Sequence, residues 1–147
     1  TRPKRSNETD GVDYFFVSRD EFERQIQNGG LLEYENVHGY YYGTPRAPLN
    51  SWIETGHVVL LDIDVYGAKR VKAKFQNSLL IFIKPPDEGV LVERLKNRST
   101  ESKQQIQKRL ERLPEEMQQA EHFDHVIMND DLSKTIDNVL NIIESQR

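Results

Sequence analysis

The stretch from residue 31 to residue 44 brings a carboxylate, several phenols and a hydroxyl close together in the sequence. Glu33 is able to accept two hydrogen bonds from a group with adjacent N–H donors, and the guanine edge with N1–H and the exocyclic amine is such a group. Thr44 adds a hydroxyl that both donates and accepts, and the phenols of residues 40–42 can reach an anionic oxygen. The alternative is a tyrosine-rich β-hairpin with a solvated glutamate, which this stretch taken alone favours.

Two aspartates, Asp62 and Asp64, lie at the carboxyl end of an apolar run over residues 58–63. Such a run predicts a strand that is buried on both faces of a parallel sheet. Ligand sites of open α/β sheets lie at the carboxyl ends of strands, so the two carboxylates could orient the water shell of a metal or bind a substrate amine or hydroxyl. An equally good alternative is that one of them caps the next helix.

Four arginines around the polar turn at residues 97–100 are candidates for binding phosphate: Arg94, Arg98, Arg109 and Arg112. Guanidinium groups hold phosphate oxygens bidentately, so one interpretation is a mobile phosphate clamp. The alternative is an exposed pair of helices with many glutamate partners, which the residues alone favour slightly. Arg2, Lys4 and Arg5 form a small cationic cluster at the start of the chain, for which a solvated basic tail is the better interpretation.

The composition excludes several kinds of site and partner. The chain has 147 residues, enough for one domain with a core, and contains no cysteine, so disulfides, thiolate metal sites and cysteine nucleophiles are excluded. A net charge of -4 gives no overall attraction to nucleic acid or to an anionic membrane. No apolar run reaches membrane-spanning length, so we expect no membrane partner and a cytoplasmic location.

The positions of these residues depend on helices and strands that alternate over most of the chain. The predicted strands cover residues 11–17, 31–44, 58–63, 79–83 and 126–128, and the predicted helices cover 18–28, 48–54, 67–75, 87–97, 102–122 and 132–144. This rhythm predicts an α/β fold with a parallel sheet, into which residues 11–44 insert a small β-rich unit. Pro114 predicts a kink or break in its helix. The last helix is expected to turn Ile136, Val139, Leu140 and Ile143 inward.

Taken in order, the motifs of the chain resemble those of the guanylate kinases from Thr1 to nearly the last residue. The matching pieces are Thr-Arg-…-Arg at 1–5, Gly-Val-Asp-Tyr-Phe-Phe-Val at 11–17, Leu-Glu at 32–33, Tyr-Tyr-Gly-Thr at 41–44, Leu-Asp-Ile-Asp at 61–64, Ile-Phe-Ile-…-Pro-Pro at 81–86, Arg-Leu-…-Arg at 94–98, Lys-Arg-Leu at 108–110 and Asn-Asp-Asp at 129–131. No single motif is specific, but their order over the whole chain is.

The resemblance implies an enzyme that transfers the γ-phosphoryl group of ATP to GMP with Mg²⁺, and it implies a role for each candidate residue. Arg2, Arg5, Tyr14 and Tyr42 would hold the GMP phosphate, Glu33 and Thr44 would bind the guanine edge, and Asp64 would belong to the nucleotide pocket. Arg98 and Arg109 would be the catalytic arginines at the transferring phosphoryl group, Arg94 and Asn129 would lie on the ATP side, and Asp62 would lie near the metal.

The fold implied by the resemblance is a P-loop NTPase-like parallel sheet with flanking helices, a small β-rich GMP-binding insertion and a helical lid. Within a single domain over 1–147, residues 1–46 would form the GMP-binding subdomain. Residues 47–92 and 123–147 would form the core, and residues 93–122 the lid and its adjoining helix.

The main departure from the family is that the sequence has no Gly-x-x-x-x-Gly-Lys-Ser/Thr phosphate loop. In the family this loop, its strand and its helix precede the position at which this chain starts, and the chain opens at Thr1 without an initiator Met. The loop amides and lysine cradle the ATP phosphates. We therefore expect a partial chain that binds GMP without transferring phosphate, and whose unpaired sheet edge favours self-association.

Smaller departures lie in the basic segment and in the lid. Residues 2–5 read Arg-Pro-Lys-Arg where the family usually has Arg-x-Pro-Arg, and Asn97 and Ser99 replace the usual glycines of the lid turn, which predicts a stiffer lid. The alternative function is a non-catalytic guanylate-kinase-like module that binds phosphopeptides, as in membrane-associated scaffolds. Such modules generally lose the catalytic arginines, so Arg98 and Arg109 favour the enzyme.

Overall fold

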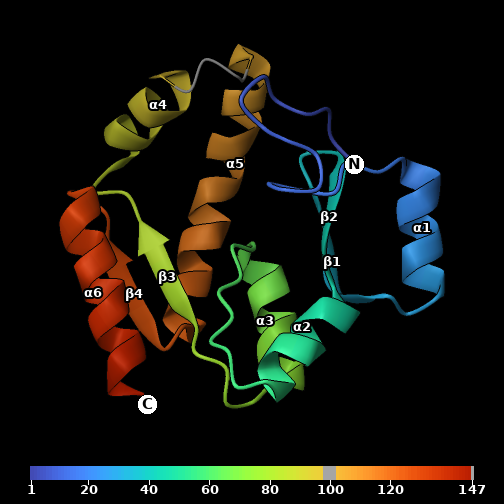
Figure 1. Ribbon diagram of the computed structural model, residues 1–147. Coiled ribbons are helices and arrows are strands. Elements are labelled where there is room, and N and C mark those ends of the chain that lie inside the picture. The colour runs from blue at the N-terminus through green and yellow to red at the C-terminus, as the bar shows by residue number, and fades with distance from the viewer. Residues whose placement is uncertain (98–101, 147) are drawn as a thin grey trace. The chain divides into compact units, whose positions relative to one another are not determined.

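The computed structural model describes residues 1–97 and 102–146. The chain divides into two compact units, Thr1–Gln76 and Asn77–Arg147, which are coloured blue to green and green to red in Figure 1. Helices and strands occur in both units, so the predicted α/β fold class is confirmed. None of the helices in the described ranges combines the length and the apolar character needed to cross a membrane.

The first unit is built on an antiparallel hairpin. Its strands are β1 (Leu31–Val37) and β2 (Tyr40–Pro45), and they are joined by a tight turn at His38 and Gly39. Both turn residues have positive φ, 54° and 90°, which is the backbone that gives a two-residue hairpin the twist of its strands. The turn fixes the register in which Glu33 pairs with Thr44 and Glu35 with Tyr42.

Three helices accompany the hairpin: α1 (Arg19–Gln27), α2 (Arg46–Glu54) and α3 (Val65–Lys74). Ser18 caps α1 by accepting a hydrogen bond from the Glu21 backbone N–H at 3.1 Å, at the predicted helix start. The core of the unit contains Leu32, Leu49 and Val71, one residue from β1, α2 and α3 respectively. Because α3 packs directly on β1, the helix is in position to contact the residues of that strand.

Residues 58–63 do not form the predicted strand. Their exposure alternates as in an extended chain: Val59, Leu61 and Ile63 pack against the core, whereas Val58 and Leu60 are 51% and 71% exposed. A strand exists only where a neighbour accepts its backbone hydrogen bonds, and no such pairing joins this segment to the other described residues. The predicted burial is therefore correct only for the face with Val59, Leu61 and Ile63, and not for the face with Val58 and Leu60.

Residues 11–17 also differ from the predicted strand, because they form a turn and a loop. Gly11 has a φ of 77°, and its N–H donates to the Tyr14 carbonyl at 2.7 Å. The carboxylate of Asp10 accepts a hydrogen bond from the Phe16 N–H at 2.9 Å. These local bonds compete with an extended ladder and close the segment on itself.

The second unit contains a parallel pair of strands, β3 (Ile81–Lys84) and β4 (His125–Met128), as the alternation of helices and strands predicted. Its helices are α4 (Glu88–Asn97), α5 (Lys103–Gln119) with a closing 3₁₀ turn (Ala120–His122), and α6 (Leu132–Ser145). Pro114 lies inside α5, which continues through it to Gln119, so the helix has no break there. Ser102 and Gln105 form a reciprocal capping box at the start of α5.

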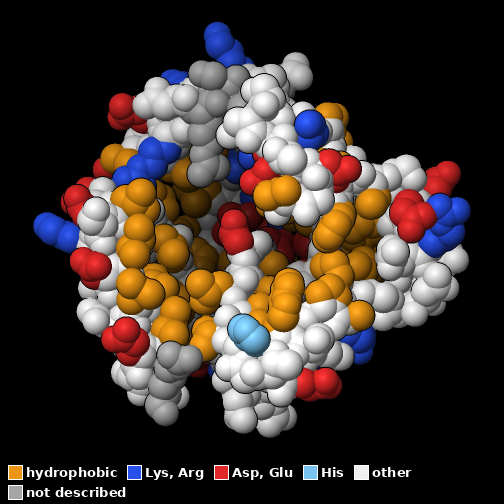
Figure 2. All heavy atoms as spheres, in the orientation of Figure 1, with side chains coloured by type: hydrophobic (Ala, Val, Ile, Leu, Met, Phe, Trp, Pro, Cys, Tyr) orange, Lys and Arg blue, Asp and Glu red, His pale blue; other side chains and the backbone are white. Residues whose placement is uncertain are grey.

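The apolar surface of α6 is wider than the surface that its neighbours cover. Thr135 is buried, but Ile136 and Leu140 are each 49% exposed, so their predicted inward orientation is wrong. Together with Leu132 they follow one another at four-residue spacing and form an apolar stripe, here called the α6 stripe. Figure 2 shows hydrophobic side chains gathered over this helix and the strands beside it.

Candidate functional site

The centre of the candidate site is a buried pair formed by Glu33 of β1 and Thr44 of β2. The two residues lie opposite each other in the hairpin, and the Thr44 hydroxyl donates to Glu33 Oε1 at 2.6 Å. Glu33 is only 4% exposed, although an ionised carboxylate loses much of its hydration when it is buried. A buried carboxylate with one hydrogen bond from a hydroxyl retains acceptor capacity for a ligand that supplies N–H donors.

The first turn of α3 closes the other side of this carboxylate. A Cβ placed on Gly67 would lie 2.7 Å from Glu33 Oε2, so a larger residue there would force the Glu33 carboxylate or the helix to shift. Asp64 caps the helix by accepting a hydrogen bond from the Gly67 N–H at 2.8 Å. Of the two roles left open for this aspartate, the cap is therefore confirmed, and contact with a nucleotide stays a prediction.

Burial raises the pKa of Glu33 above its ordinary value, and the negative charges of Asp64 and Glu35 raise it further. The hydrogen bond from Thr44 and the positive charge of Arg70 act against this increase and lower the pKa. The acceptor form of Glu33 is the ionised form, so any hydrogen bonding to N–H donors is lost as the pH falls through this raised pKa.

A second cluster brings Arg2, Tyr14 and Tyr42 together. The Arg2 Nε–H donates to the Tyr42 hydroxyl at 3.1 Å, and its guanidinium lies 5.3 Å from the centre of the Tyr14 ring. The rings of Tyr14 and Tyr42 meet edge to face at 6.2 Å. Burial and the charge of Asp62 raise the pKa of Tyr14, so its phenol stays protonated and able to donate. A cation and two phenols in one place suit an anionic oxygen.

Glu8 organises this cluster, and the sequence interpretation missed it. Its carboxylate accepts a hydrogen bond from Arg2 Nη1 at 2.7 Å, pairs also with Arg2 Nη2, and accepts from the Arg5 backbone N–H at 2.8 Å. The Arg5 guanidinium lies 3.7 Å from it. The bond to Arg2 lowers the pKa of Glu8 to about 2. An acidic residue shortly after a basic cluster is the only sequence signal for this role.

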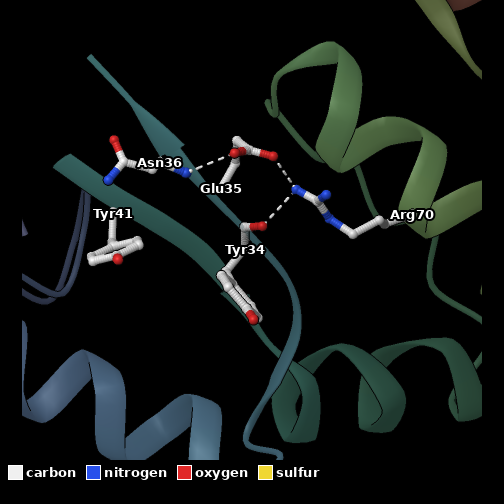
Figure 3. A pocket seen from close by; sticks show the side chains of 5 residues that line it. All are labelled: Tyr34, Glu35, Asn36, Tyr41 and Arg70. Atoms are coloured by element: carbon white, nitrogen blue, oxygen red, sulfur yellow. Dashed lines mark hydrogen bonds and ion pairs between the residues drawn. The ribbon is translucent and has the colours of Figure 1, made fainter. Parts of the chain in front are cut away.

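A third group, which sequence reasoning also missed, surrounds Arg70 of α3. A cavity of about 250 Å³ is lined by Tyr34, Glu35, Asn36, Tyr41 and Arg70 (Figure 3). The Tyr34 carbonyl and the Glu35 carboxylate of β1 both point toward the Arg70 guanidinium. Arg70 Nη2 donates to the Tyr34 carbonyl at 2.6 Å and forms an ion pair with Glu35.

In the second unit the structure brings Arg94 and Asn129 together. Arg94 Nη1 donates to the Asn129 carbonyl at 2.8 Å and Nη2 to the Asp130 carbonyl at 3.3 Å. These bonds join α4 to the end of β4. The Asn129 side chain accepts a hydrogen bond from the Thr135 hydroxyl at 3.3 Å. Both predicted ATP-side residues therefore lie at the carboxyl end of a parallel strand, where α/β folds place their ligands.

The predicted lid arginines are only partly described. Arg98 lies outside the described residues, and Arg109 lies half-buried on α5. Arg112 is 3.7 Å from Glu116 one turn further along α5, which agrees with the alternative of paired helical charges for that residue. Within the described ranges, no three carboxylate or histidine side chains gather as a metal site, so the role of Asp62 beside a metal stays a prediction.

Comparisons with known proteins agree with one another. The family model for guanylate kinase matches residues 1–146. A guanylate kinase of Thermotoga maritima is 41% identical over 147 residues, which are 100% of this chain and 71% of that protein. One from Rhodococcus jostii is 43% identical over 145 residues, 97% of this chain and 70% of that protein. The crystal structure of guanylate kinase from Anaplasma phagocytophilum has a TM-score of 0.82 at 33% identity and covers 99% of this chain and 71% of that one.

Proposed function

The chain belongs to the guanylate kinase family, and from this membership we propose that its first unit is the GMP-binding part of an enzyme that phosphorylates GMP with ATP. The observation that carries the proposal is the buried Glu33, which has a hydroxyl partner and no positively charged partner in direct contact among the described residues. Such a carboxylate suits a neutral ligand edge with two N–H donors, which guanine presents.

The hairpin arranges the two ends of GMP along one face. Residues two apart in a strand point to the same side, so Tyr42 and Thr44 share a face of β2 with Glu33 opposite. Glu33 and Thr44 bind the base in this proposal. Arg2, Arg5, Tyr14 and Tyr42 bind the phosphate, and Asp64 completes the pocket. Glu8 holds the two arginines in place.

The transfer step uses the second unit. Arg98 and Arg109 spread the charge that develops on the transferring phosphoryl group, and Arg94 and Asn129 belong to the ATP side. Mg²⁺, when bound, would neutralise negative charge on the ATP phosphates, and Asp62 would help to hold its water shell. Mg²⁺ usually keeps several of its waters and needs only one or two protein carboxylates. Asp62 fits this requirement because its carboxylate is exposed and can contact a hydrated ion.

This assignment divides the domain by role. Residues 1–46 form the GMP-binding part, residues 47–92 and 123–147 the core, and residues 93–122 the lid with its adjoining helix. GMP and ATP are the partners in this proposal, nucleic acid is not one, and the cytoplasm is the proposed location.

Nucleotide choice is the first test. GMP should bind at least tenfold more tightly than AMP, because AMP places its N1 acceptor against the Glu33 carboxylate. A buried polar group left unpaired costs about 1–3 kcal/mol. Titration calorimetry of both nucleotides measures the ratio, and Glu33→Gln, which replaces one acceptor oxygen by a donor, should reduce it toward one.

Equal affinity of the wild-type chain for GMP and AMP would refute the guanine assignment. Binding of a phosphoserine peptide without measurable binding of GMP would favour the non-catalytic protein-interaction module instead.

Phosphoryl transfer by these 147 residues alone is the second test. The sequence has no Gly-x-x-x-x-Gly-Lys-Ser/Thr loop, so nothing in it can enclose the β- and γ-phosphates of ATP. We expect a coupled assay with ATP, Mg²⁺ and GMP to show no ADP formation above background. Robust turnover would show that the ATP site lies elsewhere.

A further inference from the structure

Arg70 joins two elements that are far apart in the sequence. From α3 it donates to the Tyr34 carbonyl at 2.6 Å and pairs with the Glu35 carboxylate, both on β1 (Figure 3). One guanidinium nitrogen, Nη2, thus contacts a backbone and a side-chain acceptor of the same strand. The two N–H bonds of Nη2 lie in the guanidinium plane, which makes this double contact directional.

The contact lies next to Glu33. Tyr34 follows Glu33 directly, and Glu35 lies on the same face of β1 because side chains two apart point to one side. The ladder between β1 and β2 is irregular between Leu31 and Glu33, where the register shifts. Regular strand pairing therefore does not hold β1 on the Leu31 side of Glu33. The contacts of Arg70 on the opposite side, at Tyr34 and Glu35, consequently have more influence on the orientation of the Glu33 side chain.

We propose that Arg70 is a positioning residue for base recognition: by tying α3 to β1 at Tyr34 and Glu35, it holds the Glu33 carboxylate in the orientation that accepts both N–H donors of guanine. This inference rests on the proposed function of Glu33 as the guanine acceptor.

The charges around Glu33 support this role. Asp64, at the start of α3, and Glu35, on β1, both raise the pKa of Glu33, and Arg70 lowers it. Lys74 of α3 donates to the Leu32 carbonyl of β1, and β2 contributes the neutral hydroxyl of Thr44. Removal of the Arg70 charge raises the pKa of Glu33 further, so the loss of GMP binding at acid pH begins at a higher pH.

The test compares GMP with IMP, which keeps the N1–H of guanine but lacks its amine. Calorimetric titrations of both nucleotides use the wild-type chain, Arg70→Gln and Arg70→Lys from pH 5 to pH 8. We expect Arg70→Gln to weaken GMP about tenfold and IMP about threefold, because only GMP uses both acceptor directions. The GMP phosphate titrates near pH 6 in every sample, so a difference between variants in the pH dependence of binding reflects a change in the protein.

Arg70→Lys separates charge from geometry. The ammonium keeps the positive charge, but its rotatable N–H bonds lack the fixed planar directions of the two N–H bonds on Arg70 Nη2. The pH at which GMP binding is lost on acidification, here called the acid limb, should therefore be the same as in the wild type. The ratio of GMP affinity to IMP affinity should fall. Arg46→Gln is the matched control, because Arg46 also donates to a β1 carbonyl, that of Leu31 at 3.3 Å, but is not among the main groups that shift the pKa of Glu33.

A wild-type GMP-to-IMP ratio and acid limb in Arg70→Gln would overturn the inference while the guanine assignment stands. If Arg70→Gln does not fold, a wild-type ratio in Arg70→Lys overturns it equally. A wild-type chain without preference for GMP over AMP would overturn the proposed function, and this inference with it.

Discussion

Glu33 combines unfavourable burial of a carboxylate with the recognition function that we propose for it. Burial raises the pKa of Glu33. The Thr44 hydroxyl donates to its carboxylate, Gly67 lies against the carboxylate, and the charge of Arg70 lowers the pKa. Natural sequences retain such unfavourable groups where binding needs them, because a ligand supplies the missing hydrogen bonds. In this protein that ligand is the guanine edge in our proposal.

Gly67 gives a prediction at the scale of one atom. Gly67→Ala adds a Cβ that would lie 2.7 Å from Glu33 Oε2, closer than such contacts allow, so the carboxylate or the first turn of α3 must move. We expect GMP affinity to fall about tenfold or more, by the cost of one lost hydrogen bond pair.

Calorimetry with GMP checks this, with Gly89→Ala as the control. Gly89 also lies in the first turn of a helix, but its added Cβ would meet only the end of the Asp87 side chain, at 3.1 Å. GMP affinity unchanged in Gly67→Ala would mean that the carboxylate is not held against this turn.

At the scale of elements, our proposal assigns recognition and transfer to two different parts of the chain. The hairpin β1–β2 with the start of α3 contains the proposed base acceptors, whereas Arg109, one of the two arginines proposed for transfer, lies on α5. Interactions that strengthen only in the transition state raise the rate constant rather than the affinity.

Arg98→Ala and Arg109→Ala should therefore lower kcat far more than they weaken GMP binding. An arginine at a transferring phosphoryl group is worth about 10³-fold or more. The measurement needs a form of the enzyme that includes a phosphate loop, with steady-state kinetics for kcat and calorimetry for GMP. Arg112→Ala is the control, because Arg112 pairs with Glu116 along α5. Wild-type turnover in both variants would show that neither arginine takes part in phosphoryl transfer.

At the scale of the whole molecule, the chain exposes a strand edge and apolar side chains together. Within the described residues β3 pairs only with β4, and the α6 stripe of Leu132, Ile136 and Leu140 is open to solvent. Unpaired backbone groups beside apolar surface favour pairing with another chain.

We therefore expect these 147 residues to self-associate, with a second copy of the chain as the partner. Sedimentation velocity over a range of concentrations checks this, and Ile136→Lys with Leu140→Lys should shift the equilibrium toward monomer. Asp137→Lys, an exposed position on the same helix, is the control for added charge. A monomer at every concentration would contradict the prediction.

Much of the site could be predicted from the sequence because its determinants are local. A turn with glycine at residue 39 fixes the hairpin, the hairpin register pairs Glu33 with Thr44, and Asp64 stands where a helix cap is expected. The same holds for the parallel pairing of β3 and β4, which follows from alternating helices and strands. The family, too, follows from motifs in order along the chain.

Only the tertiary structure decided the rest, because it depends on contacts between distant residues. Arg70 reaches a strand 35 residues away, and neither its type nor its spacing announces that contact. Residues 58–63 have the composition of a buried strand, but a strand also needs a neighbour to accept its backbone hydrogen bonds. The outward face of Ile136 and Leu140 has the same cause: an apolar pattern fixes which side chains share a face, and packing alone decides what covers that face.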